Sequence, residues 1–199
     1  MIDLKVSKRL GEFSLSSELH DAGFLCLTGR NGAGKSTLLN IIAGLLAPDV
    51  GYVKINSHDV TNVPIEKRDV VLITPDSCIP HLEVSKHLEW GAKIRGLPVD
   101  PRFVQRVRDD LQIKFEGKVK KLSLGMRERV ALATALISKP SAILIDEGFA
   151  NIDDPDNFIS AYRNLSSSTD VIFTSQRSED KKFAEHHYVM VDGVARKEF

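Results

Sequence analysis

The chain has 199 residues, which is typical of one domain, and 42% of them are hydrophobic, enough for an ordinary globular core. Lysine plus arginine and aspartate plus glutamate number 27 each, so the zero formal charge argues against non-specific binding of nucleic acid or of an anionic membrane. The two cysteines, Cys26 and Cys78, do not suggest a disulfide framework and fit a reducing compartment. We expect neither a signal peptide nor a spanning helix, because no apolar run approaches about 20 residues.

The first third of the chain alternates strand and helix patterns. Residues 2–19 alternate apolar and polar side chains in patches, which indicates strands. The apolar run 24–27 indicates a buried strand, in which Cys26 is a small core side chain. A helical pattern over residues 38–43 ends at Gly44, a typical helix terminator.

Four further segments are predicted to be strands. Residues 52–55 alternate after the turn-forming segment 48–51, and together with residues 2–19 they predict a β-layer. Residues 70–73 form a continuous apolar run that is typical of a core strand. Two similar runs follow at residues 142–145 and 171–174.

The period changes to that of helices between residues 83 and 113. Two faces at helical spacing compete for burial in the first helix: Leu82, Lys86 and Trp90, or Val84, Leu88 and Ala92. The second helix follows Pro101 and repeats apolar residues at every fourth position. We therefore expect a small helical subdomain at about residues 76–120, inserted in a single domain that spans residues 1–199.

The last segment, residues 188–194, reads as a hairpin with an Asp-Gly turn. His186 and His187 precede it without a partner at metal-ligand spacing, so we expect surface side chains and no structural metal. Strands that alternate with helices favour an α/β fold with a largely parallel sheet.

The motif G-x-x-x-x-G-K-[ST] spans Gly29 to Ser36, between the predicted strand and helix, which is the context that defines a phosphate-binding loop. Glycines let several backbone N–H groups point at one anion, and the helix N-terminus adds its dipole. Lys35 would reach the β- and γ-phosphates and the Ser36 hydroxyl would bind Mg²⁺. The predicted nucleotide contacts are Asn31, Gly32, Ala33, Gly34, Lys35, Ser36 and Thr37.

Two carboxylates, Asp146 and Glu147, end the strand 142–145. In a phosphate-loop protein the first acid holds Mg²⁺, and the second can accept a proton from the attacking water. Acidic strand ends also occur on ordinary surfaces, and the phosphate loop upstream is what favours the functional interpretation.

The third motif is Leu122-Ser123-Leu124-Gly125-Met126, about twenty residues before Asp146. It resembles the LSGGQ signature of ATP-binding cassette (ABC) ATPases. The stretch 147–153 resembles the segment that follows the catalytic glutamate in that family, and residues 80–84 resemble the start of its helical subdomain. The resemblance runs over essentially the whole chain and implies a phosphate-loop NTPase core, an antiparallel β-subdomain and a helical subdomain.

The resemblance also implies a mechanism. Two cassettes, in a homodimer or heterodimer, sandwich two ATP molecules head to tail, so Ser123 and the N–H of Gly125 would contact the γ-phosphate bound by the other copy. ATP then closes the dimer, hydrolysis opens it, and a membrane-spanning permease responds. This places the chain in the cytoplasm, on the inner face of the membrane through its partner.

Four positions depart from the family pattern. Pro75 stands where a glutamine usually contacts Mg²⁺ and water, unless Asp76 substitutes. Gln176 stands where a histidine usually contacts the γ-phosphate, and an amide cannot carry the charge of that histidine. Leu124 replaces the first signature glycine. The adenine-stacking aromatic is not evident, and Phe13 is the best candidate, although a core role fits it equally well.

Three interpretations follow. The chain is a working transport ATPase, slowed by Pro75 and Gln176; a nucleotide-binding switch with weak hydrolysis; or a soluble ABC ATPase without a transport role. The intact Glu147, as catalytic base, favours the first. Residues 64–68 and 80–82 resemble importer subunits for oxyanions, sugars or polyamines, and residues 8–13 resemble molybdate/tungstate-type subunits.

Overall fold

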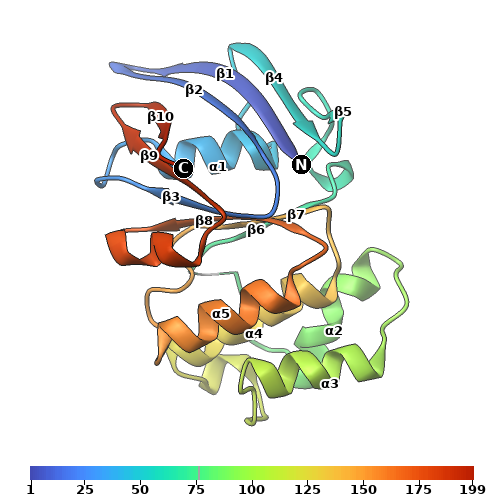
Figure 1. Cartoon of the computed structure of the whole chain (residues 1–199). Helices are drawn as coiled ribbons and strands as arrows, with labels where there is room; N and C mark the ends of the chain where they lie inside the picture. The colour runs from blue at the N-terminus through green and yellow to red at the C-terminus, as the bar shows by residue number, and fades with distance from the viewer. Residues whose placement is uncertain (76) are drawn as a thin grey trace. The chain divides into compact units, whose positions relative to one another are not determined.

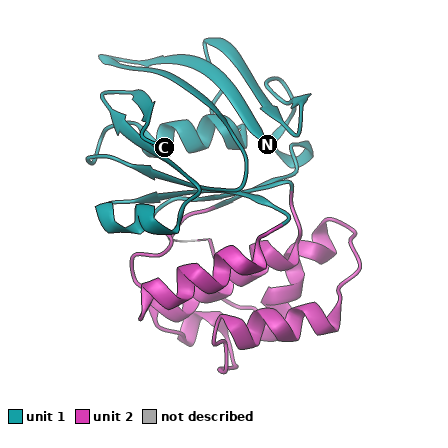
Figure 2. Cartoon of the chain, viewed as in Figure 1, with its two compact units in different colours: residues 1–72, 141–147, 168–199 teal, residues 73–140, 148–167 magenta. Residues whose placement is uncertain are grey.

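The computed structural model describes residues 1–75 and 77–199 (Figure 1). They form two compact units (Figure 2). Unit 1 comprises residues 1–72, 141–147 and 168–199, and unit 2 comprises residues 73–140 and 148–167.

Unit 1 contains an antiparallel sheet with the strand order β2-β1-β4-β5. Its strands are β1 (Ile2–Leu10), β2 (Phe13–Asp21), β4 (Val50–Ile55) and β5 (His58–Asp59). Buried and exposed side chains alternate along β1 and β2, because neighbouring residues of a strand point to opposite faces. This sheet confirms the predicted antiparallel β-layer.

The start of β4 corrects one expectation. Val50 and Gly51 were expected in a turn, yet they pair with Ser7 and Val6 of β1. Gly51 has a φ of 111°, and a Cβ at this position would lie 1.9 Å from the carbonyl oxygen of Lys5. The glycine therefore allows a close approach of two strands instead of a chain reversal.

The second sheet of unit 1 has the order β10-β9-β3-β8-β7-β6. Its strands are β3 (Phe24–Thr28), β6 (Val70–Ile73), β7 (Ala142–Ile145), β8 (Asp170–Ser175), β9 (His186–Val191) and β10 (Val194–Lys197). β3 runs parallel to β8 and β9, and β7 runs parallel to β8. The α/β fold with a largely parallel sheet is confirmed.

Two strands of this sheet refine the sequence prediction. The antiparallel β9–β10 hairpin turns at Asp192 and Gly193, which both have positive φ values, as expected of an Asp-Gly turn. β6 was expected to be a core strand, but it ends the strand order, and only Ile73 within it is fully buried.

Helix α1 (Lys35–Ala43) lies between the two sheets of unit 1, as Figure 1 shows. It ends at Gly44, whose N–H donates to Asn40 and Ile41. Side chains from both sheets and from α1 share one apolar core. Cys26 of β3 is fully buried, and burial raises the pKa of its thiol to about 12, so the predicted core role is confirmed.

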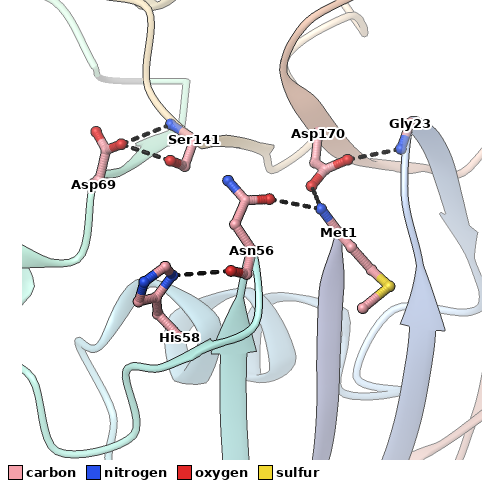
Figure 3. A network of polar contacts seen from close by, with 7 residues as sticks. All are labelled: Met1, Gly23, Asn56, His58, Asp69, Ser141 and Asp170. Atoms are coloured by element: carbon pink, nitrogen blue, oxygen red, sulfur yellow. Dashed lines mark hydrogen bonds and ion pairs between the residues drawn. The ribbon is translucent and has the colours of Figure 1, made fainter.

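A polar network joins the amino ends of β1, β3 and β8 to the carboxyl end of β4 (Figure 3). Asp170, the first residue of β8, accepts a hydrogen bond of 2.8 Å from the N–H of Gly23 and pairs with the Met1 ammonium. The same ammonium donates to the Oδ1 of Asn56 over 2.8 Å. This network lies at the opposite end of β3 from the glycine loop, because Gly23 precedes the strand and Gly29 follows it.

Unit 2 is built from α2 (Val84–Ile94), α3 (Pro101–Asp110), α4 (Leu124–Ile137) and α5 (Pro155–Leu165). In α2 the buried face is Val84, Leu88 and Ala92, whereas Trp90 is 41% exposed. Of the two faces that the sequence left open, the second is therefore the buried one. Short 3-10 turns complete the chain at η1 (Ile65–Lys67), η2 (Val119–Lys121) and η3 (Ser178–Phe183).

Candidate functional site

The glycine loop connects β3 to α1 in unit 1. Gly29, Gly32 and Gly34 have φ values of 148°, 79° and 107°, a region that favours glycine. A Cβ at Gly29 would lie 2.4 Å from the carbonyl oxygen of Met190, so this position also has no room for a side chain. Gly34 caps α1 without a side-chain hydrogen bond, which leaves the first N–H groups of the helix available to an anion.

Lys35 is folded back onto the loop that precedes it. Its side chain is buried, with only 5% exposed, and its Nζ donates to the carbonyl oxygens of Gly29 at 2.8 Å and Arg30 at 3.2 Å. The ammonium therefore lies inside the loop. Ser36 follows on α1 with its side chain exposed.

The predicted catalytic carboxylates lie at the same edge of the sheet as the glycine loop. Since β3, β8 and β7 are parallel, their carboxyl ends share one edge, which is where α/β proteins bind ligands. Asp146 and Glu147 follow β7, and Gln176 follows β8. The Nε2 of Gln176 donates to the Oε1 of Glu147 over 2.9 Å.

Thr174 connects these two strand ends, and its only signal in the sequence is a hydroxyl in an apolar strand. Its Oγ1 accepts a hydrogen bond of 2.9 Å from the N–H of Glu147 and donates one of 2.9 Å to the Oδ1 of Asp146. Glu147 has a φ of 56°, which is uncommon for a residue with a side chain.

A hollow of about 530 Å³ borders the glycine loop. Gly29, Arg30 and Asn31 line it together with Gln176. Ser178, Lys181 and Glu198 line the rest of it, whereas Lys35, Ser36, Asp146 and Glu147 are not among its lining residues.

His187 also lines this hollow, and its predicted surface position is wrong. It is only 2% exposed, because β9 is an inner strand and the ring lies against Phe199, 5.7 Å between ring centres. Its Nε2 lies 2.8 Å from the Oγ1 of Thr28, and its Nδ1 lies 3.0 Å from a carboxylate oxygen of Glu198. Burial lowers the pKa of His187, although the Glu198 carboxylate acts in the opposite direction.

Phe13 lies against the glycine loop. It is partly buried and packs on the apolar core of unit 1, and its Cζ would lie 2.8 Å from a Cβ placed on Gly34. The residue has both of the features that the sequence left open, a core contact and a position beside the loop.

Ser123 and Gly125 belong to unit 2, at the N-terminus of α4. The Oγ of Ser123 accepts a 3.3 Å hydrogen bond from the N–H of Met126, so this serine caps the helix. Ser123 and Leu124 are exposed, with Leu124 at 38%. The backbone of Gly125 meets the loop before α5, because a Cβ there would lie 2.3 Å from the carbonyl oxygen of Asn151.

Pro75 lies in a turn in which the N–H of Ser77 donates to the carbonyl oxygen of Thr74 over 3.0 Å. Its ring supplies no polar side-chain atom. The suggestion that Asp76 replaces the missing glutamine lies outside the described residues.

The donors available for magnesium are a hydroxyl, Ser36, and a carboxylate, Asp146. Oxygen ligands of this kind suit Mg²⁺, which usually takes one or two protein ligands and completes its shell with phosphate and water. The residues thus match a metal that arrives with a nucleotide.

A glycine loop between strand and helix, an acidic strand end beside it and a parallel sheet define a phosphate-loop NTPase. A family model described as "ABC transporter" matches residues 13–150. The chain belongs to this family, whose members bind ATP.

Two curated relatives are named as import ATP-binding proteins. The chain is 36% identical over 156 residues to the molybdate/tungstate import ATP-binding protein WtpC of Pyrococcus horikoshii, a match that covers 74% of the chain and 45% of that protein. It is 38% identical over 158 residues to the sulfate/thiosulfate import ATP-binding protein CysA of Synechocystis, which covers 74% of the chain and 44% of the relative. The match thus spans about half the length of these relatives.

A solved structure agrees with these matches. An ATP-binding cassette, solved as a dimer in a post-hydrolysis state with ADP and Pi, superposes with a TM-score of 0.81 at 25% identity. The superposition covers 100% of this chain and 98% of the cassette. In the described part of the chain, every helix is too short or too polar to span a membrane.

Proposed function

We propose that this chain is the ATP-binding subunit of an ABC importer and that it hydrolyses ATP between two copies of itself. The observation that carries the proposal is the position of Glu147. Its carboxylate is held by the Gln176 amide at 2.9 Å, at the sheet edge that also bears the glycine loop.

Each residue has a role in this reaction. The N–H groups of the glycine loop and Lys35 bind the phosphates, and Glu147 accepts a proton from the water that attacks the γ-phosphorus. The new P–O bond forms as the bond to the β,γ-bridging oxygen breaks, which releases ADP and phosphate. Mg²⁺, held by Ser36 and Asp146, would supply neutralisation of charge on the β- and γ-oxygens.

A second copy completes the site in this proposal. Ser123 and Gly125 stand at the exposed start of a 14-residue helix, whose N–H groups and dipole favour a phosphate. The γ-phosphate bound by one copy would meet this helix of the other. A membrane-spanning permease would then bind the closing dimer at the cytoplasmic face, and the named relatives make an oxyanion such as molybdate or sulfate the best-supported cargo class.

We further infer that turnover is slow. Gln176 already donates its amide to Glu147 and cannot supply a positive charge, and Pro75 has no polar side-chain atom. The first change removes a charged contact to the γ-phosphate and the second a contact to Mg²⁺ and the attacking water, while the glycine loop stays intact. A nucleotide-binding switch without appreciable hydrolysis is the second candidate function that these two residues favour.

Phosphate release from the purified chain with MgATP tests the proposal. Glu147→Gln keeps the size of the side chain and removes the base, so the rate should fall by about 10²–10⁴-fold while ATP still binds. Gln176→His in the same assay should raise the rate, because it restores a group that can carry charge.

Two results would argue against the ATPase. Equal phosphate release from the wild type and Glu147→Gln would mean that Glu147 is not the base. ATP binding without phosphate release in the wild type would favour the switch. Lys35→Ala provides the binding control, since calorimetric affinity close to that of the wild type would contradict the assignment of the glycine loop.

A further inference from the structure

We propose that Thr174 is a positioning residue for hydrolysis, which fixes Asp146 and Glu147 relative to each other. The inference rests on the proposed ATPase function and adds a residue that no motif marks. Its basis is one buried hydroxyl that bonds to both acidic residues.

The hydrogen bonds of Thr174 have a fixed direction. The Glu147 N–H can only donate and an ionised Asp146 can only accept, so the hydroxyl must accept from the first and donate to the second. The single hydroxyl proton is therefore directed to the Oδ1 of Asp146. No rotation of the hydroxyl satisfies both partners in another way.

Burial makes this link difficult to replace. Thr174 is only 1% exposed, and its hydrogen bonds to the half-buried Asp146 and Glu147 are partly shielded from water. An unsatisfied buried N–H is costly, and the backbone of Glu147 would move to find another acceptor. Since Glu147 already has a positive φ of 56°, its conformation depends on such support from its surroundings.

Two contacts then hold Glu147 from one strand. Thr174, within β8, fixes its backbone, and Gln176, just after β8, fixes its carboxylate. The backbone contact helps to aim a general base, because misplacement of a catalytic group by about 1 Å can cost about 10²-fold in rate. Loss of the Thr174 contact should therefore lower the catalytic rate more than it lowers the affinity for ATP.

Ser175 offers a matched control. It is the next residue along β8 and is also buried, but its hydroxyl donates to the Oδ2 of Asp180 over 2.6 Å and accepts from the N–H of Arg177. Substitution of Ser175 by alanine removes a hydroxyl from the same strand, and this hydroxyl makes no hydrogen bond to Asp146 or Glu147. Ser175→Ala thus reports the general cost of losing a buried hydroxyl there.

Steady-state phosphate release and ATP calorimetry on four proteins test the role. Thr174→Val, which keeps the shape, should lower kcat by about 10–10²-fold and leave the ATP affinity within about threefold. Thr174→Ser, which keeps the hydroxyl, should restore kcat to within about threefold of the wild type, and Ser175→Ala should stay in that range. A kcat of Thr174→Val equal to that of the wild type would overturn the proposal.

Amide exchange of Glu147, followed by NMR without nucleotide, tests the hydrogen bond independently of catalysis. The exchange should be about tenfold faster in Thr174→Val and restored in Thr174→Ser. An unchanged exchange rate would overturn the inference even if the wild type hydrolyses ATP. Faster exchange in Thr174→Val, together with no phosphate release by the wild type, would support the hydrogen bond and reject the ATPase function instead.

Discussion

Gly125 has a proposed role in nucleotide binding and a separate role in packing. The sequence marked it as a contact to a γ-phosphate in a second copy, and that role stays a proposal. The structure adds a packing reason within unit 2, since the carbonyl oxygen of Asn151 occupies the place of a Cβ, at 2.3 Å. The glycine is thus needed by the fold of unit 2 before any nucleotide is considered.

Gly125→Ala should therefore destabilise the isolated chain by about 1–3 kcal/mol, the usual cost of overpacking, because a backbone atom is harder to displace than a side chain. Thermal unfolding without nucleotide measures it. Gly91→Ala is the control, since its Cβ would lie 3.1 Å from a side-chain atom of Ser138. A melting temperature of Gly125→Ala equal to that of Gly91→Ala would contradict the packing role.

Single residues were predicted unevenly. Lys35, Glu147 and Gln176 were predicted from their positions relative to sequence motifs, and the structure places them at one sheet edge, whereas their roles stay predictions. Thr174 and His187 were missed or misplaced because their partners are far away in sequence. The partners of Thr174 are 27 and 28 residues distant, and Thr28 is 159 residues from His187. Only strand pairing brings such groups together.

At the level of elements, α2 depends on a polar contact in an otherwise apolar face. His87 is 3% exposed, its Nε2 accepts the N–H of Ile79 at 3.0 Å, and its Nδ1 lies 2.9 Å from the Oγ1 of Thr134 on α4. A nitrogen that accepts an N–H has no proton of its own, so His87 is neutral. Burial lowers the pKa of this imidazole.

The sign of the resulting pH effect follows from linkage. The unfolded chain binds a proton at its ordinary pKa of about 6.5, whereas the folded chain resists protonation to a lower pH. The contribution of His87 to stability is therefore complete above about pH 6.5 and is lost as the pH falls below that value. Glutamine can keep both hydrogen bonds but does not titrate. The melting temperature of His87→Gln should therefore fall less than that of the wild type when the pH is lowered from about 7.5 to about 5.5.

His58→Gln is the control for this pH series, because His58 is exposed. It should follow the wild-type curve. A His87→Gln curve parallel to that of the wild type would show that His87 is not the group that titrates.

The elements were predictable where hydrophobic period and turn chemistry agree. The β9–β10 turn and the end of α1 at Gly44 follow directly from Asp-Gly and glycine preferences. The start of β4 did not follow, because a glycine in a strand and a glycine in a turn look alike in sequence, and only the approach of β1 to Gly51 distinguishes them. The edge position of β6 depends on strand order, which no local pattern encodes.

At the scale of the whole molecule, the predicted nucleotide contacts are divided between the two units. The glycine loop, Phe13, both carboxylates and Gln176 belong to unit 1, whereas Ser123 and Gly125 belong to unit 2. In the proposed sandwich, unit 1 of one copy and unit 2 of another enclose each ATP. This arrangement makes ATP a ligand that favours the closed dimer, and hydrolysis the step that ends it.

The central claim, that ATP acts between two copies, is tested most directly by the mass of Glu147→Gln in solution with saturating MgATP. Light scattering during gel filtration should show a dimer of twice the 22.1 kDa of one chain, and a monomer without nucleotide. Adding Ser123→Arg to this variant should abolish the dimer and leave ATP binding intact, because the arginine obstructs the start of α4. A strictly monomeric Glu147→Gln that binds MgATP would contradict the account.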